Sequence, residues 1–447
     1  MEKFDKMQVV NPFAAGIDVG SRSHYVAVGE EKNLVKEFNV YQSGTKAIIS
    51  FLKEHSTTTV AMESTGSYWQ NLFMSLQEAG FEVLLVQGTQ TKNLKGKTDV
   101  KDAQWIQKLH KLGLLRGSFL PSESTLEMRT LVRHRSSLIE ESSKFTNKMQ
   151  KALRLMNFRL DIAVSDITGK SGIAIIEAIL AGELRGAELA KLCSKLIKKS
   201  KEEIADALQG HLNHSLMYEL KDCYSMYNFL QEKIQNVDKE IDNVLKTYTQ
   251  EVYVSDQEIE KFVKKQTKGK NQPKIEVQKY FYKLFGTDIM AIESVSTSTV
   301  LTFLSEIGTD IYKFKKAKNF VNWLRLAPNN KITGGKKISS RTPKGKNKFA
   351  LALRNAANTI EKTKDGFLVT FFRRIAYKKG RAAAITATAR KIAVMIWNMI
   401  IKKQEYKPIT TEEYMGKLRE IKTKQVEKII QKYNIDIRSL STIYNIG

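Results

Sequence analysis

Residues 15–28 read AGIDVGSRSHYVAV, and this stretch decides the fold of the N-terminal part of the chain. A short apolar run around Ile17 ends at Gly20, and a second apolar run from Tyr25 to Val28 follows after a few polar residues. Two short runs joined by a tight turn predict a β-hairpin. Asp18 lies at the end of the first predicted strand.

Further strands and helices follow along the chain in alternation. Residues 38–40, 59–62 and 81–86 are predicted to be strands, and residues 45–53 and 69–79 are predicted to be helices. This alternation predicts an α/β domain with a mixed sheet and helices packed on it.

The middle of the chain is predicted to be helical. Residues 126–156 contain no proline or glycine. A second segment repeats apolar residues in steps of four and three, which is typical of a coiled coil: Leu216, Leu220, Cys223, Tyr227, Leu230, Ile234, Val237, Ile241 and Val244. The period allows either a coiled coil between subunits or a helical hairpin closed within one chain. Residues 261–274 are polar and basic, which indicates a linker or an exposed loop.

The length of 447 residues exceeds one compact domain. We expect four regions: an α/β domain over residues 1–120, a helical and coiled-coil domain over 121–285, a mostly helical basic domain over 286–405, and a basic helical tail over 406–447.

The net charge of +26 is concentrated at one end of the chain. Residues 316–447 contain 30 basic and 8 acidic side chains, whereas residues 1–120 contain 14 and 12. A positive field confined to one region favours a polyanion, so we expect nucleic acid as the partner. A lysine-rich surface without a specific partner is the alternative.

Four carboxylates are candidates for a metal site. Asp18 and Glu63 end two predicted strands, and Asp99 and Asp102 lie three residues apart at a predicted helix start, on one face of that helix. Carboxylates crowded at one sheet edge repel each other unless cations neutralise them, and Mg²⁺ or Mn²⁺ suits such oxygen ligands. The alternative is that they cap a helix and serve a turn.

A basic loop is the second candidate site. Seven basic residues and no acid lie between residues 331 and 348: Lys331, Lys336, Lys337, Arg341, Lys344, Lys346 and Lys348. Lysines bind phosphates without regard to sequence, and glycines allow the backbone to approach a phosphate closely. The hydroxyls of Thr333, Ser339 and Ser340 lie among these cations, and a hydroxyl in this setting can attack a phosphodiester when a base or a metal takes its proton. A loop that only binds is the alternative.

Other classes of protein are disfavoured. Two cysteines are too few for a disulfide scaffold or a cysteine-cluster zinc site. No apolar run reaches the roughly 18–20 residues that span a bilayer, and the N-terminus has no apolar signal core. We therefore expect a cytoplasmic protein without a membrane partner.

Four stretches carry a resemblance to a known family: GIDVGSRSHYVAV (16–28), AMESTGSYW (61–69), KTDVKDAQWI (97–106) and WLRLAPNNKITGGKKISSRTPKGKNKFALALRNAA (323–357). They resemble the DEDD-type transposases of insertion-sequence family 110, which are relatives of the Piv-type DNA invertases. The resemblance implies a RuvC-like (RNase H-like) domain, a coiled-coil middle and a C-terminal transposase domain. It also implies an oligomeric recombinase guided by a noncoding bridge or seeker RNA, which pairs with donor and target DNA.

The resemblance assigns the metal-binding carboxylates to Asp18, Glu63, Asp99 and Asp102. We also expect Arg354 among the nucleic-acid contacts. The family carries a nucleophilic serine directly before a glycine of the basic loop, and Thr333 stands at that position here. We expect Thr333 to be the nucleophile, with Ser339 or Ser340 as alternatives. Two other functions remain open: a RuvC-like nuclease or junction resolvase, and a nucleic-acid-binding protein with a decayed catalytic site.

Overall fold

The computed structural model describes residues 7–91, 98–255, 258, 269–363 and 365–434. The chain divides into two compact units between Leu120 and Pro121. Each unit has its own hydrophobic core, and the two are described separately below.

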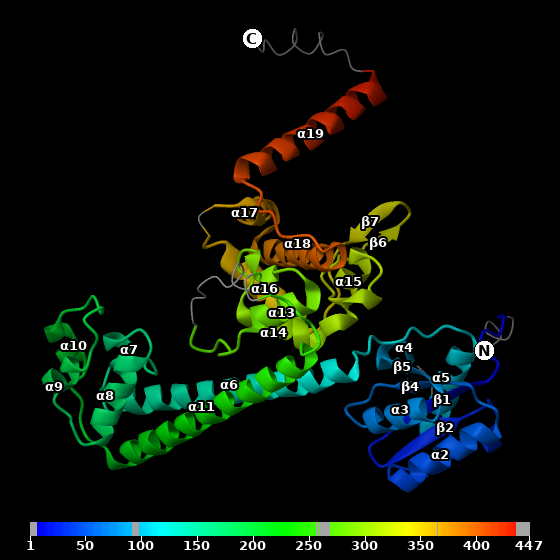
Figure 1. The fold of residues 1–447 in the computed structure, drawn as a ribbon, viewed down its shortest axis with the longest axis horizontal. Helices are drawn as coiled ribbons and strands as arrows, with labels where there is room; N and C mark the ends of the chain where they lie inside the picture. Colours follow the sequence, from blue (N-terminus) through cyan, green and yellow to red (C-terminus); the bar gives the residue numbers. More distant parts are fainter. Residues whose placement is uncertain (1–6, 92–97, 256–257, 259–268, 364, 435–447) are drawn as a thin grey trace. The chain divides into compact units, whose positions relative to one another are not determined.

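The first unit contains the predicted mixed sheet (Figure 1). Its strands are β1 (Ala14–Val19), β2 (Ser23–Ala27), β3 (Val35–Asn39), β4 (Thr59–Glu63) and β5 (Glu82–Val86), in the order β3-β2-β1-β4-β5. The first three strands pair antiparallel, while β4 is parallel to both β1 and β5. The predicted α/β fold is confirmed, and this arrangement is that of an RNase H-like sheet.

Helices cover both faces of this sheet. Alternate strand residues such as Ile17 and Met62 pack in one core with α2 (Gln42–Glu54) and α3 (Trp69–Glu78). Gly16 points to the opposite face, against the backbone of α5 (Asp99–Lys111). The short helices η1 (Lys32–Leu34) and α4 (Gly88–Thr91) complete the unit.

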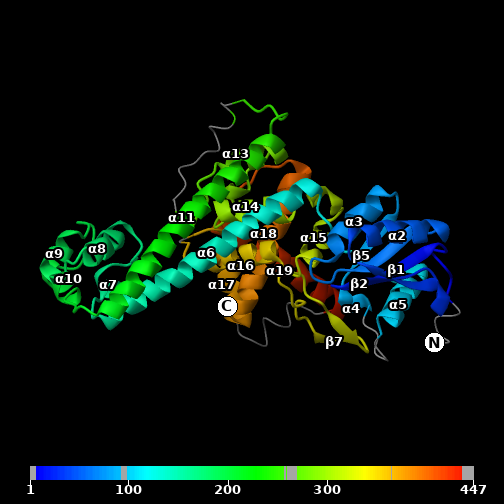
Figure 2. The same cartoon turned by 90° about the horizontal axis from the view of Figure 1, so that it is seen from below.

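Two long helices form a hairpin in the second unit. Helices α6 (Glu123–Leu155) and α11 (His214–Tyr248) lie side by side in both views (Figures 1 and 2). Leu220, Cys223 and Tyr227 of the heptad segment are buried in a core shared with α6. Of the two arrangements that the heptad period allows, the structure therefore shows the hairpin closed within one chain.

A small helical lobe connects the two long helices. It contains α7 (Leu160–Ala163), α8 (Lys170–Leu180), α9 (Gly186–Lys191) and α10 (Lys201–Ala207). Its core includes Ile175, Ile176 and Ile179 of α8 and extends onto α6 and α11. We call residues 157–213 the tip lobe.

The rest of the second unit is mostly helical. A series of contacting aromatic rings, Phe281, Phe285, Phe303, Phe320 and Phe349, contributes to its core. Its elements are α13 (Val277–Phe285), η2 (Ile289–Ala291), α14 (Thr297–Glu306), η3 (Gly308–Lys313), α15 (Ala317–Trp323), β6 (Lys331–Thr333), β7 (Lys336–Ser339), α16 (Lys348–Ile360), α17 (Phe367–Lys379), α18 (Arg381–Lys402) and α19 (Thr411–Tyr433). Residues 261–268 of the predicted linker lie outside the described residues.

Helix α18 is, among the described residues, the one helix long and apolar enough to cross a membrane by length and composition. It packs instead against α15, α16 and α17, and Ile392, Ile396 and Ile400 are fully buried there. A buried core helix of a globular domain accounts for this apolar content.

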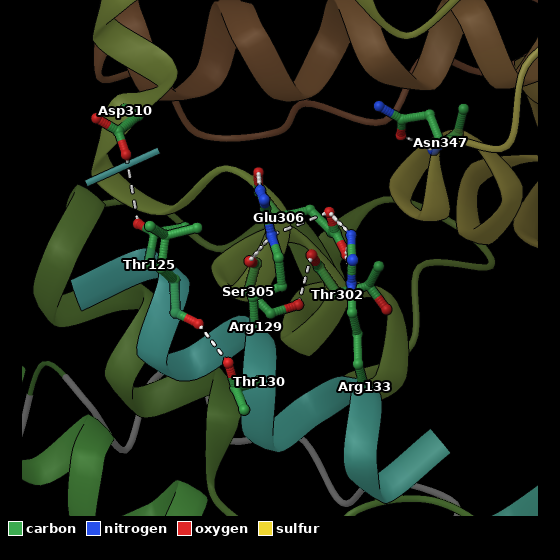
Figure 3. Close-up of polar contacts among 11 residues, drawn as sticks. Thr125, Arg129, Thr130, Arg133, Thr302, Ser305, Glu306, Asp310 and Asn347 are labelled. Carbon is green, nitrogen blue, oxygen red and sulfur yellow. Dashed lines mark hydrogen bonds and ion pairs between the residues drawn. The ribbon is translucent and has the colours of Figure 1, made fainter. Parts of the chain in front are cut away.

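The start of α6 is fixed to the C-terminal helices by a polar cluster (Figure 3). The Arg133 guanidinium donates two hydrogen bonds of 3.0 Å to the carboxylate of Glu306. Arg129 donates to the backbone oxygen of Glu306 at 2.9 Å. About two turns before Arg129, at the N-cap of α6, Ser122 donates from its backbone nitrogen to Asp310 at 2.7 Å. Charge-assisted hydrogen bonds of this kind are stronger than neutral ones, so the end of α6 nearest residue 121 is firmly attached to α14 and η3.

Candidate active site and nucleic-acid interface

Strand register brings Asp18 and Glu63 together. Gly16 of β1 pairs with Ala61 of the parallel strand β4. Asp18 and Glu63 each lie two residues beyond this pair, so they point to the same face from neighbouring strands about 4.8 Å apart. Both carboxylates are half-buried.

Helix α5 adds the other two carboxylates on that face. A side chain at position 16 would collide with the backbone of Ala103 and Gln107, so glycine allows α5 to lie directly on β1. Gln107 donates to the Ala14 oxygen at 3.1 Å, which sets the direction of α5 along the strand. The first turn of α5, with exposed Asp99 and half-buried Asp102, then lies toward the Asp18 end of β1.

The electrostatics of Asp18 reflect this convergence. Burial raises the pKa of Asp18 to about 6, and the nearby charges of Asp102, Asp99 and Glu63 add to the effect. Each of the other three predicted ligands therefore acts on Asp18, so the four form one acidic cluster in the first unit. The first turn of α5 is capped by Thr98, whose hydroxyl accepts from the Lys101 nitrogen at 3.4 Å.

Side chains that the sequence did not suggest hold Glu63 in place. Thr91 donates to Glu63 Oε2 at 2.5 Å, and Thr65 donates to Oε1 at 3.4 Å. Gly88 leaves the space that the carboxylate occupies, because a side chain there would collide with it. Thr91 and Gly88 lie far from Glu63 in sequence, and no local pattern pointed to them.

The acidic cluster suits a divalent cation by its chemistry. Its oxygen donors are those that Mg²⁺ and Mn²⁺ prefer, and a cation would relieve the repulsion that adds to the effect of burial on the pKa of Asp18. Within the described ranges, no three Asp, Glu, His or Cys side chains are close enough as placed to enclose an ion. A bound cation would therefore draw these carboxylates closer together.

Thr333 lies on a hairpin and not in an irregular loop. Strands β6 and β7 pair antiparallel, with Thr333 opposite Lys336 and the turn formed by Gly334 and Gly335. Both glycines have positive φ, +55° and +75°, which is the geometry of a tight two-residue hairpin turn. The predicted loop was thus wrong over residues 331–339, because the Gly-Gly pair between two short runs is itself a hairpin signal.

The hairpin exposes its hydroxyl and its cations. Thr333 and Ser340 are exposed, and Ser339 is half-buried. The predicted basic contacts are exposed too, except Arg354, which is half-buried on α16: Lys331, Lys336, Lys337, Arg341, Lys344, Lys346 and Lys348. The guanidinium of Arg325 donates to the Lys344 oxygen and so anchors the segment after the hairpin, a role that the sequence did not reveal.

Comparisons with known proteins agree with this fold and site. Residues 15–158 match a DEDD-type family model described as Transposase, and residues 287–367 match one described as Transposase IS116/IS110/IS902 family. A search of curated proteins found no match. The first unit is therefore a DEDD-type transposase domain with an RNase H-like sheet, which makes the protein a DNA-recombining enzyme. The chain belongs to the IS110 family of transposases, as the sequence predicted.

Proposed function

We propose that this transposase cuts and rejoins DNA through a covalent bond between Thr333 and a DNA phosphate. The observation that carries the proposal is the acidic cluster, in which Asp99, Asp102 and Glu63 all act on Asp18. Asp18, Glu63, Asp99 and Asp102 would hold Mg²⁺ or Mn²⁺. When bound, a divalent cation neutralises charge on the scissile phosphate and helps to activate an oxygen nucleophile.

In the proposed step, Thr333 Oγ1 attacks the phosphorus of a DNA phosphodiester. The Oγ1–P bond forms as the bond from phosphorus to one sugar oxygen breaks, and the hydroxyl loses its proton as the leaving oxygen gains one. Religation reverses these changes with a different DNA end. The tight turn supports this role, because it presents an exposed hydroxyl on a short, paired strand.

Lys331, Lys336, Lys337, Arg341, Lys344, Lys346, Lys348 and Arg354 would hold the nucleic-acid backbone near that hydroxyl. These contacts carry little sequence information. We therefore propose that a noncoding bridge RNA supplies target choice by base pairing, as in other guided systems. This part of the proposal is supported by the family resemblance and by the net charge of +22 over residues 316–447. Sequencing the RNA that co-purifies with the protein, and comparing it with the DNA beside the gene, tests it.

We also propose a homo-oligomer, a dimer or tetramer, through the coiled-coil helices. The acidic cluster and Thr333 belong to different units, so the reaction requires the two units to meet on DNA, within one subunit or between two. Because α6 already covers the heptad residues of α11, the contact would use apolar side chains on the outer surface of α11. Tyr218, Met226 and Phe229 are exposed there.

Trapping the covalent intermediate tests the chemistry. With a nicked DNA substrate that prevents religation, we expect a protein–DNA adduct whose attached peptide contains Thr333. Thr333→Val, which keeps the shape without the hydroxyl, should abolish the adduct, and Thr333→Ser should form it at least as fast because it removes a crowding methyl group. Ser339→Ala and Ser340→Ala are the controls.

An adduct that maps to Ser339 or Ser340 would assign the nucleophile to that serine instead of Thr333. DNA cleavage without any adduct would favour a nuclease or junction resolvase that uses activated water. Binding without cleavage would favour a protein with a decayed site.

A further inference from the structure

The tip lobe has no role in the proposed chemistry, and although its net charge is zero, its basic side chains are concentrated in one connection. Residues 191–201, which connect α9 to α10, read KLCSKLIKKSK and contain five lysines and no acid. All five side chains are exposed: Lys191, Lys195, Lys198, Lys199 and Lys201. An anion that binds this connection would reduce the repulsion among its cations.

Hydrogen bonds among the described residues account for two of these lysines, and Lys201 acts electrostatically on its neighbour Glu202. Lys191 bonds to the carboxylate of Glu188 at 2.7 Å. Lys199 donates to the Ile162 oxygen at 2.8 Å, so it fixes the connection to α7. Lys195, Lys198 and Lys201 remain as exposed cations on the same connection, and we call these three the tip lysines.

The backbone that carries the tip lysines is held in place. The Ser194 nitrogen donates to Ser171 Oγ on α8 at 3.0 Å, and the Ile197 nitrogen donates to the Ser194 oxygen at 3.1 Å. Cys193 and Ile197 pack against the core of the lobe. Leu196, between them, is 91% exposed, so none of the residues that the structure describes covers this surface. Cations on a fixed, open surface lose little backbone entropy when they meet a ligand.

The tip lobe is separated in space from the basic β6–β7 hairpin. The first turns of α6 contact Glu306 on α14, and the lobe follows its last turn. Arg133, which contacts Glu306, lies 22 residues before Leu155 at the end of α6, so the lobe begins about 33 Å along the helix from this contact. Ten base pairs of duplex cover a similar length, about 34 Å.

We propose that the tip lysines form a second nucleic-acid contact, which binds the phosphodiester backbone of DNA or RNA at a distance from the basic hairpin. The inference rests on the proposed function for the presence of nucleic acid, and it adds a site to the C-terminal contacts. The site recognises backbone phosphates, so it increases affinity and binding-site length without selecting sequence.

Salt-dependent binding of full-length protein tests this proposal. The probes are a mixed-sequence 40-base-pair DNA duplex and a structured RNA of similar length, each titrated between about 50 and 300 mM NaCl. In a variant with Lys195→Gln, Lys198→Gln and Lys201→Gln, we expect the slope of log affinity against log salt to fall by about 2 to 3 for the bound probe, because each lost phosphate contact removes about 0.7–0.9. If the slope falls with only one of the two probes, that probe identifies whether DNA or RNA is the ligand of the tip lysines.

The matched control removes three exposed lysines from the two long helices, α6 and α11: Lys151→Gln, Lys221→Gln and Lys239→Gln. An unchanged slope in the tip variant, or an equal fall in both variants, would overturn the proposal. So would loss of binding to anionic vesicles in the tip variant with nucleic-acid binding intact. Absence of binding by the wild-type protein would instead reject the proposed function.

Discussion

Asp18 shows how a single residue connects the fold with the chemistry. Its strand position, beside a glycine that admits α5, surrounds it with three other carboxylates. The pKa of a free aspartate is near 3.9, and that of Asp18 is raised to about 6. Because the folded pKa lies above the unfolded one, Asp18 stabilises the fold at low pH, and this contribution is lost as the pH rises through about 6.

Substitution of Asp18 should therefore separate stability from metal binding. At pH 7.5 without metal, we expect Asp18→Asn to raise the melting temperature of the first unit, because it removes a crowded charge. Mg²⁺ or Mn²⁺ should stabilise the wild-type protein, by about 2.7 kcal/mol at a hundredfold excess over Kd, and should stabilise Asp18→Asn much less. Thermal unfolding with and without metal measures both effects.

Glu54→Gln, an exposed site on α2, is the control and should respond to metal like the wild type. Equal stabilisation of Asp18→Asn by metal would show that the cation binds elsewhere.

His110 gives the first unit a pH dependence of the opposite sign. Its side chain is buried, and its Nε2 lies 2.9 Å from Thr59 Oγ1. The Thr59 hydroxyl donates a hydrogen bond to the backbone oxygen of Glu82. Burial lowers the pKa of His110 below its usual value of 6.5. Since the unfolded chain takes up a proton near pH 6.5 and the folded chain does so only at lower pH, stability is full above pH 6.5 and is lost as the pH falls.

In an Asp18→Asn background, which removes the opposing contribution of Asp18, we expect the free energy of unfolding of the first unit to decrease between pH 7.5 and 5, and His110→Gln to reduce that slope. The slope should not vanish, because burial also lowers the pKa of His24. Denaturant unfolding at several pH values measures it. Exposed His211→Gln is the control, and an identical slope in His110→Gln would contradict the assignment.

At the scale of elements, the α6–α11 hairpin contains polar layers within its apolar seam. Arg135 and Asp238 are both buried, with their closest nitrogen and oxygen 2.5 Å apart. One heptad further along, Gln231 donates to Ser142 Oγ at 2.8 Å. The second pair lies seven residues later on α6 and seven residues earlier on α11 than the first pair. The two pairs together therefore specify one antiparallel register of the helices. A buried polar pair is a known way of fixing register in helical packing.

Breaking this pair on one side should be costly. We expect Asp238→Ala to destabilise the second unit by about 3–5 kcal/mol, because it leaves the Arg135 guanidinium buried without its counter-charge. The double variant Arg135→Met with Asp238→Leu should recover most of that loss, since apolar side chains of similar size can fill the seam. Denaturant unfolding of both variants checks this. A double variant as unstable as Asp238→Ala would show that the pair itself supplies stability.

The elements also show what the sequence could and could not predict. Short apolar runs predicted the sheet, because its central strands are buried on both faces. The helical stretches α6 and α11 were predicted because each keeps a regular apolar face. The same periodicity could not decide between a hairpin and a coiled coil between subunits, since buried seams look alike whichever helix covers them. The hairpin at Thr333 was missed because its strands are exposed and short, and Gly334 with Gly335 was interpreted as a loop. The supports of Glu63 depend on residues distant in sequence.

At the scale of the whole molecule, charge and chemistry are divided between the units. The acidic cluster lies in the first unit, which is nearly neutral, and the net charge of +22 lies in the last third of the chain. This division is expected when one part binds a polyanion and another supplies carboxylates that must not repel it at long range.

Removing cations near the β6–β7 hairpin should therefore weaken nucleic-acid binding in a way that depends on the salt concentration. For Lys344→Ala, Lys346→Ala and Lys348→Ala together, we expect the salt slope of DNA binding to fall by about 2 to 3. Titration by fluorescence anisotropy measures it, with the Lys151, Lys221 and Lys239 variant as the control. An unchanged slope would exclude these three lysines as phosphate contacts.

Helix α6 also has a mechanical consequence. It is clamped to α14 through Glu306 at one end and embedded in the core of the tip lobe at the other. The continuous helix extends about 33 Å beyond Arg133 and behaves as a stiff lever, so a tilt of about 5° at the clamp displaces the far end by roughly 3 Å. Small rearrangements of the C-terminal helices during strand exchange would thus be magnified into a swing of the lobe.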